Sequence, residues 1–253
     1  MKRPYVLVFS TVTIDGRIAS STGYSILSCP YDKARLLLLR GYSDAVMVGA
    51  STVLIDDPGL RKRLEPRGER YYRVVVDGRL RIAERPELRV LREREPRTIV
   101  FTAANGERVE KLRGMGVDVH VVPSGEPGRV DLGEALRILA EEYGVRRLLV
   151  EGGGVLTYSL LSERLVDELR VTVTPYVFAA GRSVVDDPGG MGFPDRDRGP
   201  RLELLCTELC PCGNCVHIAY RVVDRRGEPL ASSHSPQCLS NKLREVLAGA
   251  GQG

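Results

Sequence analysis

The 253-residue sequence contains no tryptophan, only three histidines and only four phenylalanines. Lysine is also rare, since it occurs only at positions 2, 33, 62, 111 and 242, and arginine supplies most of the positive charge. Asparagine and glutamine are scarce as well. A composition of this kind matches an arginine-rich, heat-adapted proteome, and we expect a thermophilic source.

Long apolar runs are missing too, and none is long enough to span a bilayer. Residues 1–4 lead directly into a short strand pattern without the layout of a signal peptide. We therefore expect a soluble, cytoplasmic protein with no membrane partner. The net charge is only +4, and the basic residues between positions 61 and 97 are interleaved with glutamates. Mixed charge of this kind is typical of a solvated surface, so we expect no nucleic-acid partner.

Hydrophobic residues make up 43% of the chain, which is enough for a sizeable core. Short apolar segments alternate with helical patterns, and this alternation predicts an α/β fold with a mostly parallel central sheet and helices on both faces. The expected strands are 5–10, 45–49, 73–77, 98–102, 117–122, 147–150, 168–174, 202–207 and 215–222. No helix-length segment separates the last two, so we expect a C-terminal antiparallel hairpin at the sheet edge.

The helices have recognisable ends. Ser28 can cap a helix that begins near Pro30 and ends at Gly41. Further helices are expected at 107–113 and 156–162. A stripe of apolar residues at helical spacing predicts another helix, and its members are Leu132, Ala135, Leu136, Leu139 and Ala140. Glycine, proline and serine dominate after position 223, so we divide the chain into a domain at 1–223 and a flexible C-terminal tail at 224–253.

The run from Glu151 to Gly154 is the most informative feature of the chain. It lies between an apolar strand pattern and the start of a helix. Glycines allow a tight turn and close approach of a ligand, and the N–H groups of the following helix favour an anion such as a phosphate. The alternative interpretation is a tight turn without a ligand.

The segment 49–60 directly follows an expected strand, as the run from Glu151 to Gly154 does. It ends with Asp56, Asp57 and Pro58, which form either part of a site or a turn that stops a helix. In open α/β sheets, ligands bind beyond the carboxyl ends of the strands. Two strand-ending segments with small and acidic residues therefore favour a binding crevice.

These segments belong to a longer series that recurs in one known family in the same order and spacing. The series comprises Pro4-Tyr5, residues 13–19 (TIDGRIA), Arg40, residues 47–49 (MVG), residues 52–58 (TVLIDDP), Leu60, residues 75–77 (VVD), residues 151–156 (EGGGVL), residues 165–168 (LVDE) and Pro175. Over residues 4–223 the chain resembles the pyrimidine reductase of riboflavin biosynthesis, whose domain has the dihydrofolate reductase-like fold. Residues 25–29 are more similar to the stand-alone archaeal form than to the bacterial one.

The resemblance implies an NADPH-dependent reductase that works as a homodimer, and it assigns roles to matching positions. Residues implied to bind NADPH are Thr52, Asp56, Val76, Asp77, Gly78, Gly154, Val155, Leu156 and Thr157. Residues implied to bind the substrate are Ser25, Arg40, Leu60, Arg63 and Glu151. These residue types suit the chemistry, because arginine binds a phosphate bidentately and a glutamate accepts hydrogen bonds from pyrimidine amino groups.

The implied reaction converts the ribosylamino group of 2,5-diamino-6-ribosylamino-4(3H)-pyrimidinone 5′-phosphate into a ribitylamino group. The first alternative is the same chemistry on the deaminated substrate, 5-amino-6-(5-phosphoribosylamino)uracil. A second is a non-catalytic nucleotide-binding module, whose signature would be loss of Asp56, Glu151 or the glycine turn; the chain retains all of these. The general acid stays unassigned: Asp57, Glu151 and a bound water are all open.

The six cysteines are unevenly placed. Cys29 stands alone, Cys238 lies in the tail, and Cys206, Cys210, Cys212 and Cys215 crowd together. Residues 211–215 fit the second half of a zinc-deaminase signature, but no histidine begins the His-x-Glu half, so we expect no deaminase activity. Free thiols, one or two disulfides, and a small zinc or cluster site all remain open for the crowded cysteines. Their spacing is not the paired Cys-x2-Cys pattern of structural zinc, and we assign no metal ligands.

Overall fold

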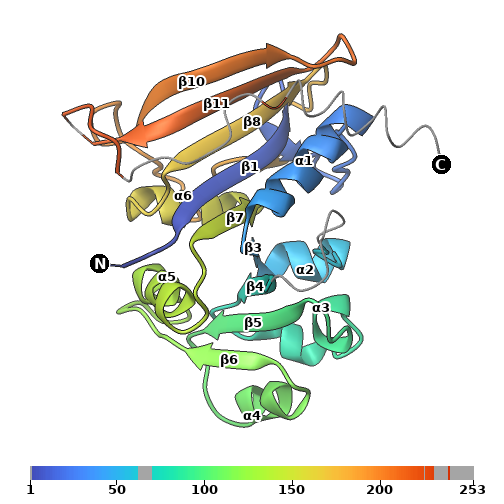
Figure 1. Cartoon of the computed structure of the whole chain (residues 1–253), viewed down its shortest axis with the longest axis vertical. Coiled ribbons are helices and arrows are strands. Elements are labelled where there is room, and N and C mark those ends of the chain that lie inside the picture. The colour runs from blue at the N-terminus through green and yellow to red at the C-terminus, as the bar shows by residue number, and fades with distance from the viewer. Residues whose placement is uncertain (1, 62–69, 225, 231–238, 240–253) are drawn as a thin grey trace.

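The computed structural model describes residues 2–61, 70–224, 226–230 and 239. Eleven strands lie within them: β1 (Tyr5–Thr13), β2 (Arg17–Ala19), β3 (Ala45–Gly49), β4 (Tyr72–Val76), β5 (Arg97–Thr102), β6 (Asp118–Val121), β7 (Arg147–Glu151), β8 (Glu168–Thr174), β9 (Arg182–Ser183), β10 (Arg201–Leu209) and β11 (Val216–Val223). Nine of them form the central sheet in the order β10-β11-β8-β1-β7-β3-β4-β5-β6 (Figure 1). Strands β2 and β9 form a small separate pair.

The central sheet is parallel from β8 to β6. Only β11 runs against its neighbours, since it pairs antiparallel with both β8 and β10. The predicted fold class is therefore confirmed, including the C-terminal hairpin at one edge. In a parallel sheet all carboxyl ends lie on the same side, and this side carries the candidate site described below.

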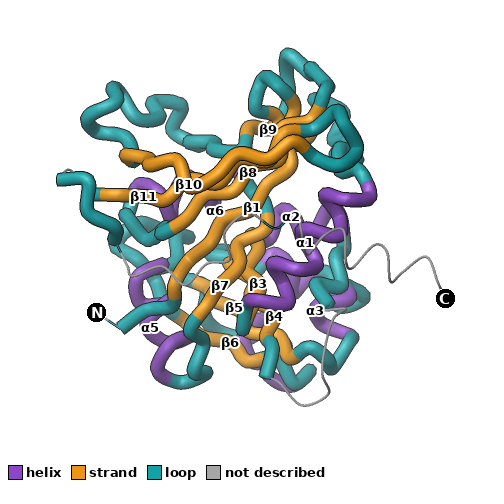
Figure 2. The backbone as a smooth tube through the Cα atoms, turned by 45° about the horizontal axis from the view of Figure 1, so that its top comes forward, coloured by secondary structure: helices purple, strands orange, loops and turns teal. Residues whose placement is uncertain are grey.

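Seven helical elements connect the strands. They are α1 (Pro30–Tyr42), α2 (Ala50–Asp56), the short 3-10 helix η1 (Arg81–Glu84), α3 (Arg89–Arg92), α4 (Glu107–Gly114), α5 (Leu132–Glu141) and α6 (Gly154–Ser162), all within the described ranges. Figure 2 shows the strands of the central sheet side by side, with helices gathered along them. Within the described part of the chain, no helix is long and apolar enough to cross a bilayer.

Alternation along the buried strands directs side chains to both faces of the sheet. In β1, Val6 and Val8 join the core beneath α5 and α6, whereas Leu7 and Phe9 pack beside α1 on the other face. Helices α2, α3 and α4, with η1, cover a third core on residues such as Val46 and Val48 of β3. Burial on both faces explains why these strands are apolar throughout instead of alternating with polar residues.

The structure corrects the predicted ends of α1. The N-cap is Cys29 and not Ser28, because the Cys29 thiol accepts a hydrogen bond from the Asp32 N–H. The helix also continues through Gly41 to Tyr42, and Ser43 is its C-cap. Sequence preference favours serine over cysteine as a cap, so local pattern alone could not identify the residue that performs this role.

Most of the proposed tail lies outside the described residues, and the division at residue 223 stays a prediction. Leu239 is described and is 2% exposed, packed in the core cluster beside α1 that contains Leu7 and Leu38. At least one residue of the tail is therefore part of the folded core in this structure.

Candidate active site

A cavity of about 990 Å³ opens at the carboxyl ends of the central strands. Its wall includes residues 9–11 of β1, Gly49 at the end of β3, Val76 at the end of β4 and Glu151 at the end of β7. These four strands are neighbours in the order β1-β7-β3-β4. The two strand-ending segments singled out in the sequence therefore meet in one crevice.

The glycine turn forms one side of the cavity. Gly152 and Gly153 have φ angles of +72° and +89°, a region that favours glycine. Helix α6 starts directly after them, with Gly153 as its N-cap and no side-chain capping bond. No acidic residue occupies its first turn. The first N–H groups of α6 thus form a positive helix end that suits an anion.

Packing within the protein itself requires glycine at position 154. A Cβ atom at this position would lie 2.3 Å from the carbonyl oxygen of Ser183 and 2.7 Å from Cβ of Asp186. The Asp186 N–H donates to the Gly154 carbonyl at 3.1 Å. The segment 183–186 therefore packs directly on the helix start, and only glycine permits this approach.

Helix α2 supplies Thr52 and Asp56 to the cavity wall. Burial raises the pKa of Asp56, while the positive charge of Arg182 opposes this effect. Asp57 is engaged elsewhere: it caps the helix at a φ of 40°, and its carboxylate accepts a hydrogen bond from the Arg89 N–H at 2.7 Å. Asp57 does not line the cavity, which weakens its candidacy as the general acid.

The carboxylate of Glu151 faces a partner that the sequence did not suggest. Arg40 at the end of α1 donates to it twice, from Nε and Nη2, both at 2.6 Å. The two side chains are 14% and 12% exposed. Burial alone would lower the pKa of Arg40, but the hydrogen bond and charge of Glu151 outweigh burial and raise it. Glu151 lines the cavity, whereas Arg40 does not.

Comparison of the sequence with known protein families identifies the family of this chain. A family model described as the RibD C-terminal domain matches residues 4–218. The chain belongs to this family.

Two relatives and one solved structure illustrate the range of the RibD C-terminal domain family. The chain is 41% identical over 208 residues, covering 80% of it and 91% of the relative, to a 2,5-diamino-6-ribosylamino-4(3H)-pyrimidinone 5′-phosphate reductase of Methanothermobacter thermautotrophicus. It is 35% identical over 224 residues to the riboflavin biosynthesis protein RibD of Actinobacillus pleuropneumoniae, covering 88% of the chain and 58% of that protein.

The solved structure is a diaminohydroxyphosphoribosylaminopyrimidine deaminase/5-amino-6-(5-phosphoribosylamino)uracil reductase from Thermotoga maritima. It superimposes with a TM-score of 0.69 at 25% identity, covering 88% of this chain and 57% of that one. The chain thus spans somewhat more than half of these two longer family members and nearly all of the archaeal one. The expected α/β fold with a mostly parallel central sheet is therefore shared with this RibD-type structure.

The family positions fall into two groups in space. Those that line the cavity are Ser25, Thr52, Asp56, Val76, Gly78, Glu151, Gly154, Val155 and Leu156. Those that are described but do not line it are Arg40, Leu60, Asp77 and Thr157. Leu60 and Thr157 are buried at 3% and 0% exposure, and Asp77 accepts a hydrogen bond from the Ile82 N–H at 2.9 Å. Arg63 lies outside the described residues.

Three arginines of the cavity escaped the sequence analysis of this RibD-like domain: Arg81, Arg129 and Arg182. Arg81 donates to Ser51 Oγ at 3.2 Å, and Arg129 pairs with Glu126 at 2.9 Å. They come from η1, from the loop before α5 and from the two-residue strand β9. Mixed charge and very short elements gave no local signal, so only the fold could bring these residues together.

The electrostatic effect of Arg182 on Asp56 can be tested by titration. Because the Arg182 cation favours the ionised carboxylate, Arg182→Gln should raise the pKa of Asp56 further above its usual range. Carbon-detected NMR of the Asp56 carboxyl group across a pH series measures this value. The control is Arg113→Gln, which removes a surface arginine paired with Glu110 and should leave the Asp56 titration unchanged. An unchanged Asp56 pKa in Arg182→Gln would contradict this electrostatic effect.

Proposed function

We propose that the chain catalyses the NADPH-dependent reduction of 2,5-diamino-6-ribosylamino-4(3H)-pyrimidinone 5′-phosphate to its ribitylamino product in riboflavin biosynthesis. The observation that carries the proposal is the cavity at the strand ends, in which the glycine turn and Glu151 face the same space. The 41% identity to an archaeal reductase of this name over 91% of its length supports the choice of substrate.

The cavity suits a phosphate-bearing dinucleotide in size and charge. Its volume of about 990 Å³ lies within the range of cofactor sites. The uncapped start of α6 offers N–H groups, and Arg81, Arg129 and Arg182 offer positive charge to phosphates. Gly78 brings the backbone segment 128–129 close, since a Cβ atom there would lie 2.0 Å from the Gly128 carbonyl oxygen. When bound, NADPH supplies the hydride that reduces C1′ of the ring-opened sugar.

The protein then has to hold the pyrimidine in the correct orientation. We assign this role to Glu151, whose carboxylate accepts hydrogen bonds from the amino groups of the ring. Arg40 donates to both oxygens of that carboxylate, which limits its rotation. Ser25, which lies in the loop before α1 and lines the cavity, is the proposed second polar contact.

A pair of variants tests whether Arg40 and Glu151 act as a unit. Glu151→Gln should reduce kcat/KM for the pyrimidine roughly tenfold or more, because a charge-assisted hydrogen bond is worth about 1.5–3 kcal/mol. The Kd for NADPH should change far less. Arg40→Gln should have a similar effect, and the double variant should lose less than the product of the two single losses. The control is Glu87→Gln, a surface glutamate 54% exposed on its side chain. If the loss of kcat/KM in the double variant equals the product of the two single losses, the two residues contact the substrate independently.

Steady-state kinetics of the purified full chain tests the proposed function directly. With NADPH we expect turnover of the diaminopyrimidinone phosphate, and lower kcat/KM with the deaminated uracil phosphate. The second substrate is included because the Thermotoga maritima relative is named as a uracil reductase. Parallel runs with NADH measure the cofactor preference. Higher kcat/KM with the uracil would reverse the substrate assignment, and no turnover of either pyrimidine would refute the function.

We also propose that the enzyme is a homodimer that uses the β10 edge. Strand β10 lies at one edge of the sheet and pairs only with β11 among the described strands (Figure 1). Its residues Leu202, Leu204 and Leu209 are 38%, 56% and 68% exposed. An edge strand with exposed leucines offers hydrophobic surface to a second copy.

Substitution at this edge should change the oligomeric state. Leu204→Arg should convert the dimer into a monomer, because it places a charge within the proposed contact; light scattering coupled to size-exclusion chromatography measures the mass. The control is Val121→Arg, which alters a residue 38% exposed on β6 at the opposite edge of the sheet. A dimer that persists in Leu204→Arg would exclude this surface.

A further inference from the structure

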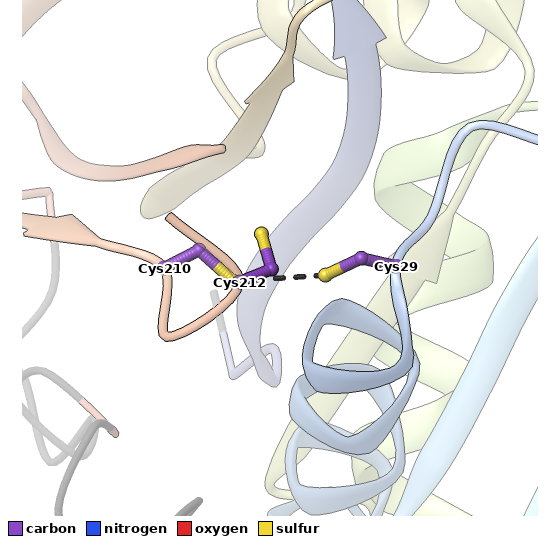
Figure 3. A group of neighbouring side chains, drawn as sticks. All are labelled: Cys29, Cys210 and Cys212. Atoms are coloured by element: carbon purple, nitrogen blue, oxygen red, sulfur yellow. Dashed lines mark hydrogen bonds between the residues drawn. The ribbon is translucent and has the colours of Figure 1, made fainter. Parts of the chain in front are cut away.

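The fold regroups the cysteines that crowd together in the sequence. Cys206 is disulfide-bonded and is therefore not one of the free cysteines that lie together. Cys29, Cys210, Cys212 and Cys215 are free. Cys29 lies at the start of α1, and the other three lie in the turn between β10 and β11, more than 180 residues later in the chain. Figure 3 shows Cys29 directed at the turn that carries Cys210 and Cys212.

The sulfur atoms have the spacing of metal ligands. Sγ of Cys29 and Sγ of Cys210 are 3.6 Å apart, and these atoms and Sγ of Cys212 all lie within 4.8 Å of one another. Cys215 lies in the same turn, where its carbonyl oxygen accepts a hydrogen bond from the Cys210 N–H at 2.8 Å. A tetrahedral zinc ion with Zn–S bonds of about 2.3 Å separates its sulfur ligands by about 3.8 Å. A disulfide requires about 2.05 Å.

The cysteines lie in a mostly buried setting. The Asp32 N–H donates to the Cys29 thiol at 3.4 Å. Cys210 and Cys215 are 4% and 3% exposed, whereas Cys29 and Cys212 are partly buried. Several thiols gathered in one place form a soft ligand set, which favours zinc over a hard cation.

We propose that Cys29, Cys210, Cys212 and Cys215 together bind one Zn²⁺ ion. Residues 212–215 then supply one Cys-x2-Cys half of the site, and Cys210 and Cys29 supply the rest. Four thiolates fill a tetrahedral ion and leave no open position, so the site is structural and not catalytic. The ion joins the start of α1 to the β10–β11 turn. Ser28, next to Cys29, lines the cavity, so the ion also fixes one part of that wall.

Metal analysis of the purified full chain tests the proposal without any measurement of reductase activity. We expect about one zinc per chain by plasma mass spectrometry after exhaustive dialysis. Cys29→Ser and Cys212→Ser should each lose most of it. Cys206→Ser is the control, because it opens a disulfide in the same hairpin but removes no ligand of the proposed site, and it should retain zinc.

A spectroscopic measurement on the unmutated chain covers the case in which the variants fail to fold. After replacement of the ion by Co²⁺, four thiolates in a tetrahedron should give intense sulfur-to-metal charge-transfer absorption. Stoichiometric iron lost from Cys29→Ser would support the four-thiolate site with another metal. Substoichiometric metal with no cobalt uptake, metal retained in Cys29→Ser, or a disulfide among these four residues by peptide mass spectrometry would overturn the proposal.

Discussion

The parallel pairing of β1, β7, β3 and β4 is the constraint on which the candidate site depends. Because the four strands are aligned in one direction, Gly49 lies opposite Val76, and Glu151 lies opposite Phe9. Every residue that follows one of these strand ends is therefore delivered to the same edge of the sheet. The buried apolar faces of the strands maintain this register, since a shift by one residue would turn core side chains to the wrong face.

The sequence predicted the elements whose pattern is local and left out those that depend on tertiary contacts. Alternating apolar segments predicted the sheet and α5, whose stripe from Leu132 to Ala140 is buried as expected. The short elements β2, β9 and η1 carry no periodicity, and they were not predicted. The same holds for the site: the sequence indicated Glu151 and the glycine turn, whereas Arg129 and Arg182 reach the cavity from a loop and a two-residue strand that carry no local pattern.

The ion pair of Arg40 and Glu151 shows why a family position does not by itself define a contact. Both residues match the family pattern, and each could touch substrate alone. In the structure they satisfy each other, and both are largely removed from water. Removing one partner of such a pair leaves a poorly solvated charge, so a single substitution measures both the lost function and this penalty. The comparison of single and double variants separates these contributions.

The cysteine cluster shows the same limit over a longer distance. Spacing along the chain grouped Cys206 with Cys210, Cys212 and Cys215. Sequence spacing alone does not show which side chains meet, because side-chain direction depends on whether a residue lies in a strand or in a turn. The strand β10 ends at Leu209, so Cys206 belongs to the strand while the other three belong to the turn. Their fourth partner is set by where the start of α1 lies against this turn, which no local pattern encodes. Bringing two such distant segments together costs chain entropy, and a metal ion bound by both would offset part of that cost.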